Sequence, residues 1–178
     1  MISFVSLHDH IINIWTNYRL KHLSFKCKGA NVRISNRFRI GHSENLTLHD
    51  NIVLGENIFI NAHGGVEICS GVITGPDVMI FSVNHIYESR DVLPFAEELQ
   101  FKKVVIGENC WIGARAFICP GVELGEGCVV AGGAVVTKSF PKCSVIGGNP
   151  AKIIKKRDET LYLKAKEKGI YNSFISQV

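Results

Sequence analysis

The sequence has 178 residues, a length that suits a single domain, and a formal net charge of +4. No apolar run approaches the roughly 20 residues that span a bilayer, and the N-terminus lacks a signal-peptide pattern, so we expect a cytoplasmic protein. We expect no nucleic-acid partner. The charge is nevertheless uneven, because seven basic residues and no acidic residue lie between Arg19 and Arg39, which favours an anionic partner.

Residues 2–23 predict a short amphipathic helix, because the apolar residues in this stretch recur at helical spacing. They are Leu7, Ile11, Ile14, Trp15 and Tyr18. We interpret residues 1–31 as a helical cap that shields the open edge of the segment that follows. The alternative is a weak association with a membrane surface, which rests on the Arg and Lys residues after the helix.

A six-residue period begins at Ile34 and becomes strict from Ile106 to Val136, and it belongs to neither a helix nor an ordinary strand. The strict members are Ile106, Ile112, Ile118, Leu124, Val130 and Val136. Compact apolar residues follow four positions later, at Cys110, Ala116, Val122, Cys128 and Ala134. This pattern predicts a β-solenoid with two inward positions in each hexapeptide.

Three interruptions mark the solenoid. Two steps of eight residues indicate corner insertions, around residues 45–47 and at Gly64-Gly65. Between residues 81 and 103 the repeat stops, and loops of this length inside compact domains are commonly functional. After Val136, Pro and Gly residues mark the exit from the coils, and 158–169 resembles a short helix that packs on the wall.

The six cysteines include no Cys-x-x-Cys pair, and two of them occupy inward positions of the repeat. We therefore interpret them as reduced core residues, and we predict no metal site.

Four motifs carry a resemblance to a known family: Asn84-His85, VVIGENCWIGARAFICPGV, GGAVVTK and GGNPAKIIKKR. Together they resemble the hexapeptide-repeat acyltransferases, in the sugar and xenobiotic O-acetyltransferase group related to galactoside and maltose acetyltransferases. The resemblance implies a mainly β, left-handed parallel β-helix of about five coils over residues 32–157, three hexapeptides to a coil, with an excursion loop at 81–103. Residues 1–31 and 158–178 are then short helical appendages. The N-terminal substrate-binding segment of the galactoside and maltose enzymes is not recognisable here, so the chain looks closer to the polysaccharide-biosynthesis members.

The resemblance implies an acetyl-CoA-dependent transfer of acetyl to a sugar hydroxyl, with His85 as the catalytic base. Imidazole, with an ordinary pKa of about 6.5, suits proton transfer near neutral pH. Glu88, Asp91 or a backbone carbonyl would orient the ring. Asn61 and Asn84 match acceptor-binding positions, although Asn61 would equally suit an amide contact between coils.

For acetyl-CoA the resemblance implies a groove between neighbouring prisms of a homotrimer. The matching positions are Ala114, Gly132, Thr137, Lys138, Lys152 and Lys155. The lysines supply charge for phosphate, although a solvated basic face would give the same pattern. Trp111 is expected to pack at a corner.

Two other functions remain open. The same fold and co-substrate would serve an N-acyltransferase that acts on an amino sugar nucleotide. A non-catalytic β-helix scaffold would use the prism only for assembly.

Overall fold

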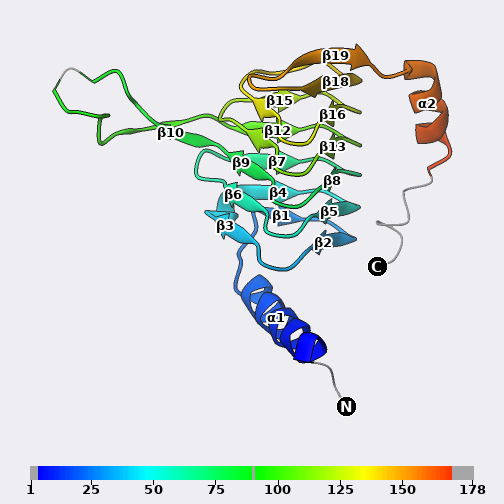
Figure 1. The fold of residues 1–178 in the computed structure, drawn as a ribbon, viewed down its shortest axis with the longest axis horizontal. Coiled ribbons are helices and arrows are strands. Elements are labelled where there is room, and N and C mark those ends of the chain that lie inside the picture. Colours follow the sequence, from blue (N-terminus) through cyan, green and yellow to red (C-terminus); the bar gives the residue numbers. More distant parts are fainter. Residues whose placement is uncertain (1–3, 90, 170–178) are drawn as a thin grey trace.

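The computed structural model describes residues 4–89 and 91–169, and it is a left-handed parallel β-helix with three walls (Figure 1). Sheet A has five parallel strands: β1 (Cys27–Lys28), β4 (Leu46–Leu48), β7 (Val66–Ile68), β12 (Val104–Ile106) and β15 (Glu123–Leu124). Sheet C also has five: β3 (Arg39–Gly41), β6 (Phe59–Asn61), β9 (Met79–Phe81), β14 (Phe117–Ile118) and β17 (Val135–Val136).

Sheet B is the tallest wall. Its parallel strands are β2 (Val32–Ile34), β5 (Ile52–Leu54), β8 (Ile73–Thr74), β13 (Trp111–Ile112), β16 (Val129–Val130) and β18 (Ser144–Gly147). The antiparallel strand β19 (Lys152–Lys156) closes it. Six parallel strands make six coils, one more than the five that we predicted. The sixth was missed because Phe140 and Ile146 fill inward positions beside Pro and Gly residues that we interpreted as the exit.

The inward positions predicted from the period are confirmed. The six aliphatic residues from Ile106 to Val136 and the five compact residues between them are all buried. Thr74 stands in an aliphatic position and is also buried, and its Oγ1 accepts a hydrogen bond from the Gly55 N–H at 2.9 Å. The polar atom is thereby satisfied inside the stack, which explains why a threonine is tolerated there.

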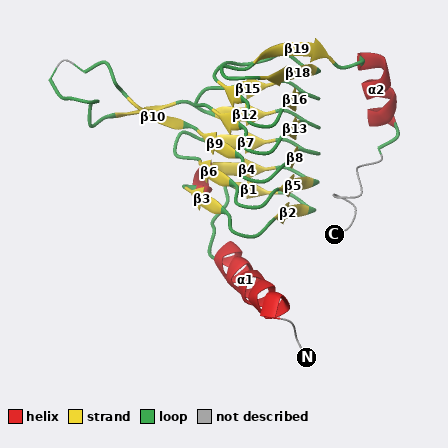
Figure 2. Ribbon diagram, viewed as in Figure 1, coloured by secondary structure: helices red, strands yellow, loops and turns green. Residues whose placement is uncertain are grey.

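Helix α1 (Phe4–Lys21) confirms the predicted N-terminal helix, and it extends from the first coil away from the stack (Figure 2). Its contacts with the prism come from the face that carries Thr16 and Leu20, with Arg19 over the Phe38 ring and Asn36 donating to Asn13. The predicted apolar stripe, by contrast, is exposed from Ile11 to Tyr18, so it does not cap the coil. The side chain of Leu7 lies outside the described residues. No helix in the described part of the chain is long and apolar enough to cross a membrane.

Helix α2 (Glu159–Glu167) confirms the predicted C-terminal helix and its packing on the prism. Asp158 caps it by accepting from the Leu161 N–H, as a short polar residue at this position typically does. Tyr162 is buried and donates to Glu126 at 2.8 Å, and Lys166 pairs with Glu126 and Glu108. Desolvation and the Glu126 carboxylate raise the pKa of Tyr162 to about 12. The helix therefore docks at turns between sheets A and B.

Candidate active site

All three interruptions of the repeat lie at one corner of the prism, between sheets C and A. The first contains the 3₁₀ turn η1 (Ser43–Asn45), and the second is the turn around Gly64. The third is the excursion, which leaves after β9 as an antiparallel hairpin of β10 (Val83–His85) and β11 (Leu99–Phe101). Figure 1 shows this hairpin projecting far from the coils. The predicted excursion and the insertion at Gly64 are confirmed, whereas the first insertion lies at Ser43–Asn45, about two residues before its predicted position, because Leu46–Leu48 forms β4. Part of the excursion is a paired ribbon rather than an irregular loop.

The base of the hairpin is tied to the coil below it through Ser82, which is fully buried. Its Oγ donates to the Asn61 carbonyl at 2.9 Å and accepts from the Gly64 N–H at 2.9 Å. The Lys102 N–H donates to the Ser82 carbonyl from the returning strand. A Cβ at Gly64 would collide with that same carbonyl oxygen, so glycine is needed for this close approach.

Aromatic rings stack along the same corner and support the returning strand. The His42 and His63 rings are parallel, with centroids 3.8 Å apart, and the Phe101 ring on β11 meets His63 edge-on at 4.6 Å. The Asn45 side chain also donates to the His63 carbonyl. The two short insertions thus act as a support for the hairpin that carries the candidate base.

His85 is exposed at the last position of β10, where it pairs with Leu99. Its ring stacks on Phe95, with centroids 3.9 Å apart and an interplanar angle of 29°. Within the described residues neither Glu88 nor Asp91 forms a hydrogen bond with the His85 ring, and the ring contact that the structure shows is with Phe95. No sequence signal identified Phe95, because the hairpin lies outside the six-residue period.

Asn61 and Asn84 lie on either side of the hairpin base. Asn61 ends β6 next to Phe81 of the following coil, and its side-chain oxygen accepts from the His63 N–H at 3.3 Å. Asn84 pairs with Gln100, and its side-chain oxygen accepts from the His85 N–H at 2.9 Å. The exposed amide of Asn84 therefore stands directly beside the candidate base.

The predicted main-chain contacts to the acyl donor lie at a different corner, between sheets B and C. Ala114 and Gly132 occupy equivalent turns of successive coils, and the Gly133 N–H donates to the Ala114 carbonyl at 2.8 Å. A Cβ at Gly133 would meet no atom within 4 Å, so the backbone is open to a ligand here. An extended ligand would fit along this corner beside Ala114, Gly132 and Gly133, with the exposed Arg115, which lies 3.8 Å from Asp77, in the same turn.

The predicted basic positions lie at the C-terminal end of the prism and are exposed. Thr137 and Lys138 follow β17, while Lys152 and Lys155 lie on β19 opposite Gly147 and Val145. Nearby, Lys156 donates to Ser144 and Arg157 donates to the Gly127 carbonyl, so these two cations hold the fold together. Within one chain the structure brings His85 next to Asn84, and Ala114 next to Gly132, but these two pairs belong to different corners.

The described residues contain one cluster that could hold a metal ion, on the outer face of sheet A: His49, Glu67 and Cys69, with ligand atoms within 4.8 Å of one another. Lys103 already pairs with Glu67 at 2.7 Å, and His49 lies 3.0 Å from the same carboxylate. Lys103 first, and then His49, lower the pKa of Glu67. These contacts form a charge network that accounts for the orientation of Glu67 without a metal ion.

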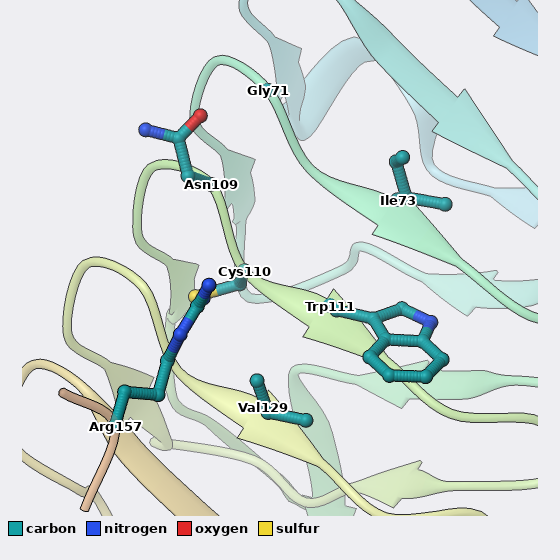
Figure 3. Close-up of a pocket in the computed structure, with 7 residues that line it drawn as sticks. All are labelled: Gly71, Ile73, Asn109, Cys110, Trp111, Val129 and Arg157. Carbon is teal, nitrogen blue, oxygen red and sulfur yellow. The ribbon is translucent and has the colours of Figure 1, made fainter. Parts of the chain in front are cut away.

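The outer surface of sheet B carries an apolar hollow of about 380 Å³. Figure 3 shows Ile73, Trp111 and Val129 standing on the neighbouring strands β8, β13 and β16. Trp111 is 57% exposed on the strand itself, so its predicted position at a corner is wrong. The residue is on the wall because the six-residue period places it directly before the inward Ile112.

Comparison with known proteins gives the same family as the motifs. A family model described as "Hexapeptide repeat of succinyl-transferase" matches residues 103–138. WcaF of Escherichia coli, whose name assigns it to colanic acid biosynthesis as an acetyltransferase, is 30% identical over 146 residues, covering 82% of this chain and 77% of WcaF. The chain belongs to the hexapeptide-repeat acyltransferases. The acetyltransferase YJL218W of Saccharomyces cerevisiae is 34% identical over 123 residues, 68% of this chain, which spans only 61% of that longer relative.

Solved structures of hexapeptide-repeat acyltransferases share the fold. The hexapeptide-repeat acetyltransferase VCA0836 of Vibrio cholerae superposes with a TM-score of 0.71 at 26% identity, covering 79% of each chain. AntD of Bacillus cereus, an N-acyltransferase in complex with dTDP-4-amino-4,6-dideoxyglucose and coenzyme A, superposes with a TM-score of 0.68. That match covers 86% of this chain and 96% of AntD, but at 18% identity it indicates the fold alone.

Proposed function

We propose that this acyltransferase moves acetyl from acetyl-CoA to a hydroxyl of a sugar during the biosynthesis of a surface polysaccharide. The similarity to WcaF supports the reaction class and the process. The observation that carries the proposal is His85, which is exposed on a hairpin whose base is fixed by buried Ser82. We place the catalytic unit at residues 32–157 between the appendages 1–31 and 158–178, and the reaction in the cytoplasm.

In the proposed mechanism, His85 accepts the proton of the sugar hydroxyl as the hydroxyl oxygen attacks the thioester carbonyl carbon. A C–O bond forms, and the C–S bond of the thioester then breaks. The same imidazole, now protonated, gives its proton to the departing CoA sulfur. Phe95 fixes the plane of the ring, and the Asn84 and Asn61 side chains bind the acceptor.

Acetyl-CoA would lie along the corner that contains Ala114 and Gly132, with Thr137 beside it. Lys138, Lys152 and Lys155 would meet its phosphates, since all three ammonium groups are exposed at one end of the prism. Because His85 and this corner are separate within one chain, we propose a homotrimer in which the hairpin of one subunit faces the corner of the next.

The outer surfaces of the walls support this assembly. Sheets B and C present apolar columns, with Ile73, Trp111 and Val129 on one and the contacting rings of Phe59, Phe81 and Phe117 on the other. Sheet A instead presents Thr47, Glu67 and Glu123 to solvent. Two apolar walls and one polar wall fit a closed assembly around an axis parallel to the prisms.

The second candidate is an N-acyltransferase, since the fold of this chain is shared by AntD, whose structure holds an amino sugar nucleotide and coenzyme A. A panel of hydroxyl and amino acceptors, free and nucleotide-linked, would separate the two functions through acetyl-CoA consumption. Faster turnover of amino sugars than of their hydroxyl analogues would show that the protein is an N-acyltransferase and not the proposed O-acetyltransferase. Absence of acetyl-CoA binding would instead favour the non-catalytic β-helix scaffold.

The test of the base is His85→Ala, which should lower turnover by about 10²-fold or more with little change in acetyl-CoA affinity. His49→Ala is the matched control, because His49 is exposed but lies on sheet A, where it pairs with Glu67. Loss of turnover in the control, with His85→Ala fully active, would show that the base has been misassigned.

A further inference from the structure

Helix α1 presents an apolar stripe that no described part of the chain covers. The stripe consists of Ile11, Ile14, Trp15 and Tyr18, which are 48%, 56%, 62% and 58% exposed. Their spacing of three and four residues places them on one face of the helix. Four large exposed apolar side chains in one patch typically mark an interaction surface.

Contacts on the opposite face fix the orientation of this stripe. Thr16 is buried, Leu20 packs against the core, and Asn13 accepts from the Asn36 side chain of the first coil. These contacts hold α1 against the first coil, and the stripe on the opposite face of the helix therefore points away from the prism. Rotation of the helix to bury Trp15 against the prism would break these contacts.

The charge around the stripe is positive. By helical geometry Arg19 and Lys21 lie on its two sides, with the Arg19 guanidinium over the Phe38 ring. Lys26 directly precedes the first strand of sheet A, and Lys28 ends that strand. No described carboxylate forms an ion pair with Lys21, Lys26 or Lys28. The segment 19–39 contains no acidic residue, so the end of the prism from which α1 emerges is cationic.

We propose that α1 docks this protein on the surface of a bilayer that contains anionic phospholipids. Tryptophan and tyrosine suit the boundary between headgroups and acyl chains, because each has an apolar ring and one polar atom. The exposed Lys21 and the lysines that follow it can place their cations among the phosphates. The helix would lie in the interface, in keeping with its inability to cross a membrane.

The charges favour lipid over a second copy of the chain. Parallel pairing of two stripes, as in a three-fold assembly, would bring Arg19 and Lys21 of the copies together, and like charges at a desolvated contact are repulsive. An anionic headgroup layer neutralises the same residues. The proposal does not depend on the identity of the acceptor, although it would bring the enzyme to glycans that are attached to lipid.

The test is flotation of the full-length protein with vesicles of phosphatidylcholine, with and without about 30% phosphatidylglycerol. Binding should require the anionic lipid and weaken as salt is added. The double change Ile14→Gln with Trp15→Gln should reduce partitioning about tenfold or more, and Lys21→Gln about fivefold. Leu161→Gln, which removes an apolar side chain 64% exposed on α2, should bind as the unmodified protein does.

A second readout uses fluorescence, since the chain has only two tryptophans. In a Trp111→Phe background, Trp15 emission should shift to the blue on anionic vesicles alone. Equal binding to both vesicle types, or no effect of the double change, would overturn the proposal. So would a change of oligomeric state in the double variant without lipid, because the stripe would then be a contact between copies. Acetyl transfer to a free sugar should be unaffected by the double change, which separates this outcome from a failure of the proposed activity.

Discussion

At the scale of single residues, Phe95 and Ser82 hold the candidate base in place. Phe95 stacks on the His85 ring, and the buried Ser82 joins the base of the hairpin to the coil below it. Both contacts depend on how the hairpin folds back on itself, so the hexapeptide period does not predict them. The family motif alone points to His85, because one histidine among seven carries no signal by residue type.

The stacked pair makes Phe95 a positioning residue with a testable effect. Phe95→Ala should lower kcat about tenfold, because the imidazole loses the ring that fixes its plane, while the affinity for acetyl-CoA stays the same. Steady-state kinetics with both substrates would measure it. Phe95→Tyr keeps the ring and should restore most of the rate; a tyrosine variant as slow as the alanine variant would show that stacking has no role.

The exposed lysines at the C-terminal end should determine affinity for the acyl donor. Lys138→Glu or Lys152→Glu should raise the Kd for acetyl-CoA about tenfold or more, because each reversal adds repulsion toward phosphate. Isothermal calorimetry gives the Kd directly. Lys164→Glu on α2 changes the total charge equally and should leave the Kd alone. Unchanged binding in both Lys138→Glu and Lys152→Glu would place the phosphates elsewhere.

At the scale of elements, helical periodicity predicted both terminal helices but not which residues each helix face contacts. The stripe of α1 was expected to cover the first coil, and it faces outward because the contacts of Thr16 and Asn13 decide the rotation. An amphipathic pattern says that a face needs an apolar partner without saying which partner. In α2 the polar contacts to Glu126 could not be predicted, since they join residues about two coils apart in sequence.

Docking of α2 should depend on pH through Glu126. Lys166 first, and then Tyr162, lower the pKa of this carboxyl below its ordinary 4.5 despite partial desolvation. A lowered folded pKa means that the contribution to stability is present above pH 4.5 and is lost as pH falls through the lowered value. Thermal unfolding between about pH 3 and 6 should show this decline.

Lys166→Met is the control for that pH dependence. Without the ammonium group the pKa of Glu126 should return toward 4.5, and the acid decline in melting temperature should become shallower. An identical acid decline in the variant would assign the effect to other carboxylates.

At the scale of the whole molecule, the proposed trimer makes a direct prediction. Light scattering should give three times the mass of one chain, and Trp111→Glu should lower it, because a charge would enter the apolar wall of sheet B. Leu161→Glu places the same charge on α2 and should leave the trimer intact. A fully active monomer would rule out a site shared between subunits.

The prism itself was largely predictable, because every coil has the same inward positions to bury and therefore uses similar residue types at them. The six-residue period predicted a solenoid and its inward positions, and the family resemblance predicted the three-walled prism. The sequence pattern predicted neither the sixth coil nor the antiparallel pairing of the hairpin strands. At the ends of a solenoid a coil has a neighbour on one side only, so the selection for a clean period is weaker there.

The corner between sheets C and A has a practical consequence. Three successive coils lengthen at this one position, yet the strands on both sides remain in register, from β6 with β9 to β7 with β12. The antiparallel pairing of β10 with β11 brings the two ends of the excursion together before the chain re-enters the coils. Segment 86–98 can therefore be exchanged as a cassette: replacing it with the hairpin tip of another member of the family should leave the melting temperature of the host prism nearly unchanged, while Asn61, Asn84 and His85 stay in place.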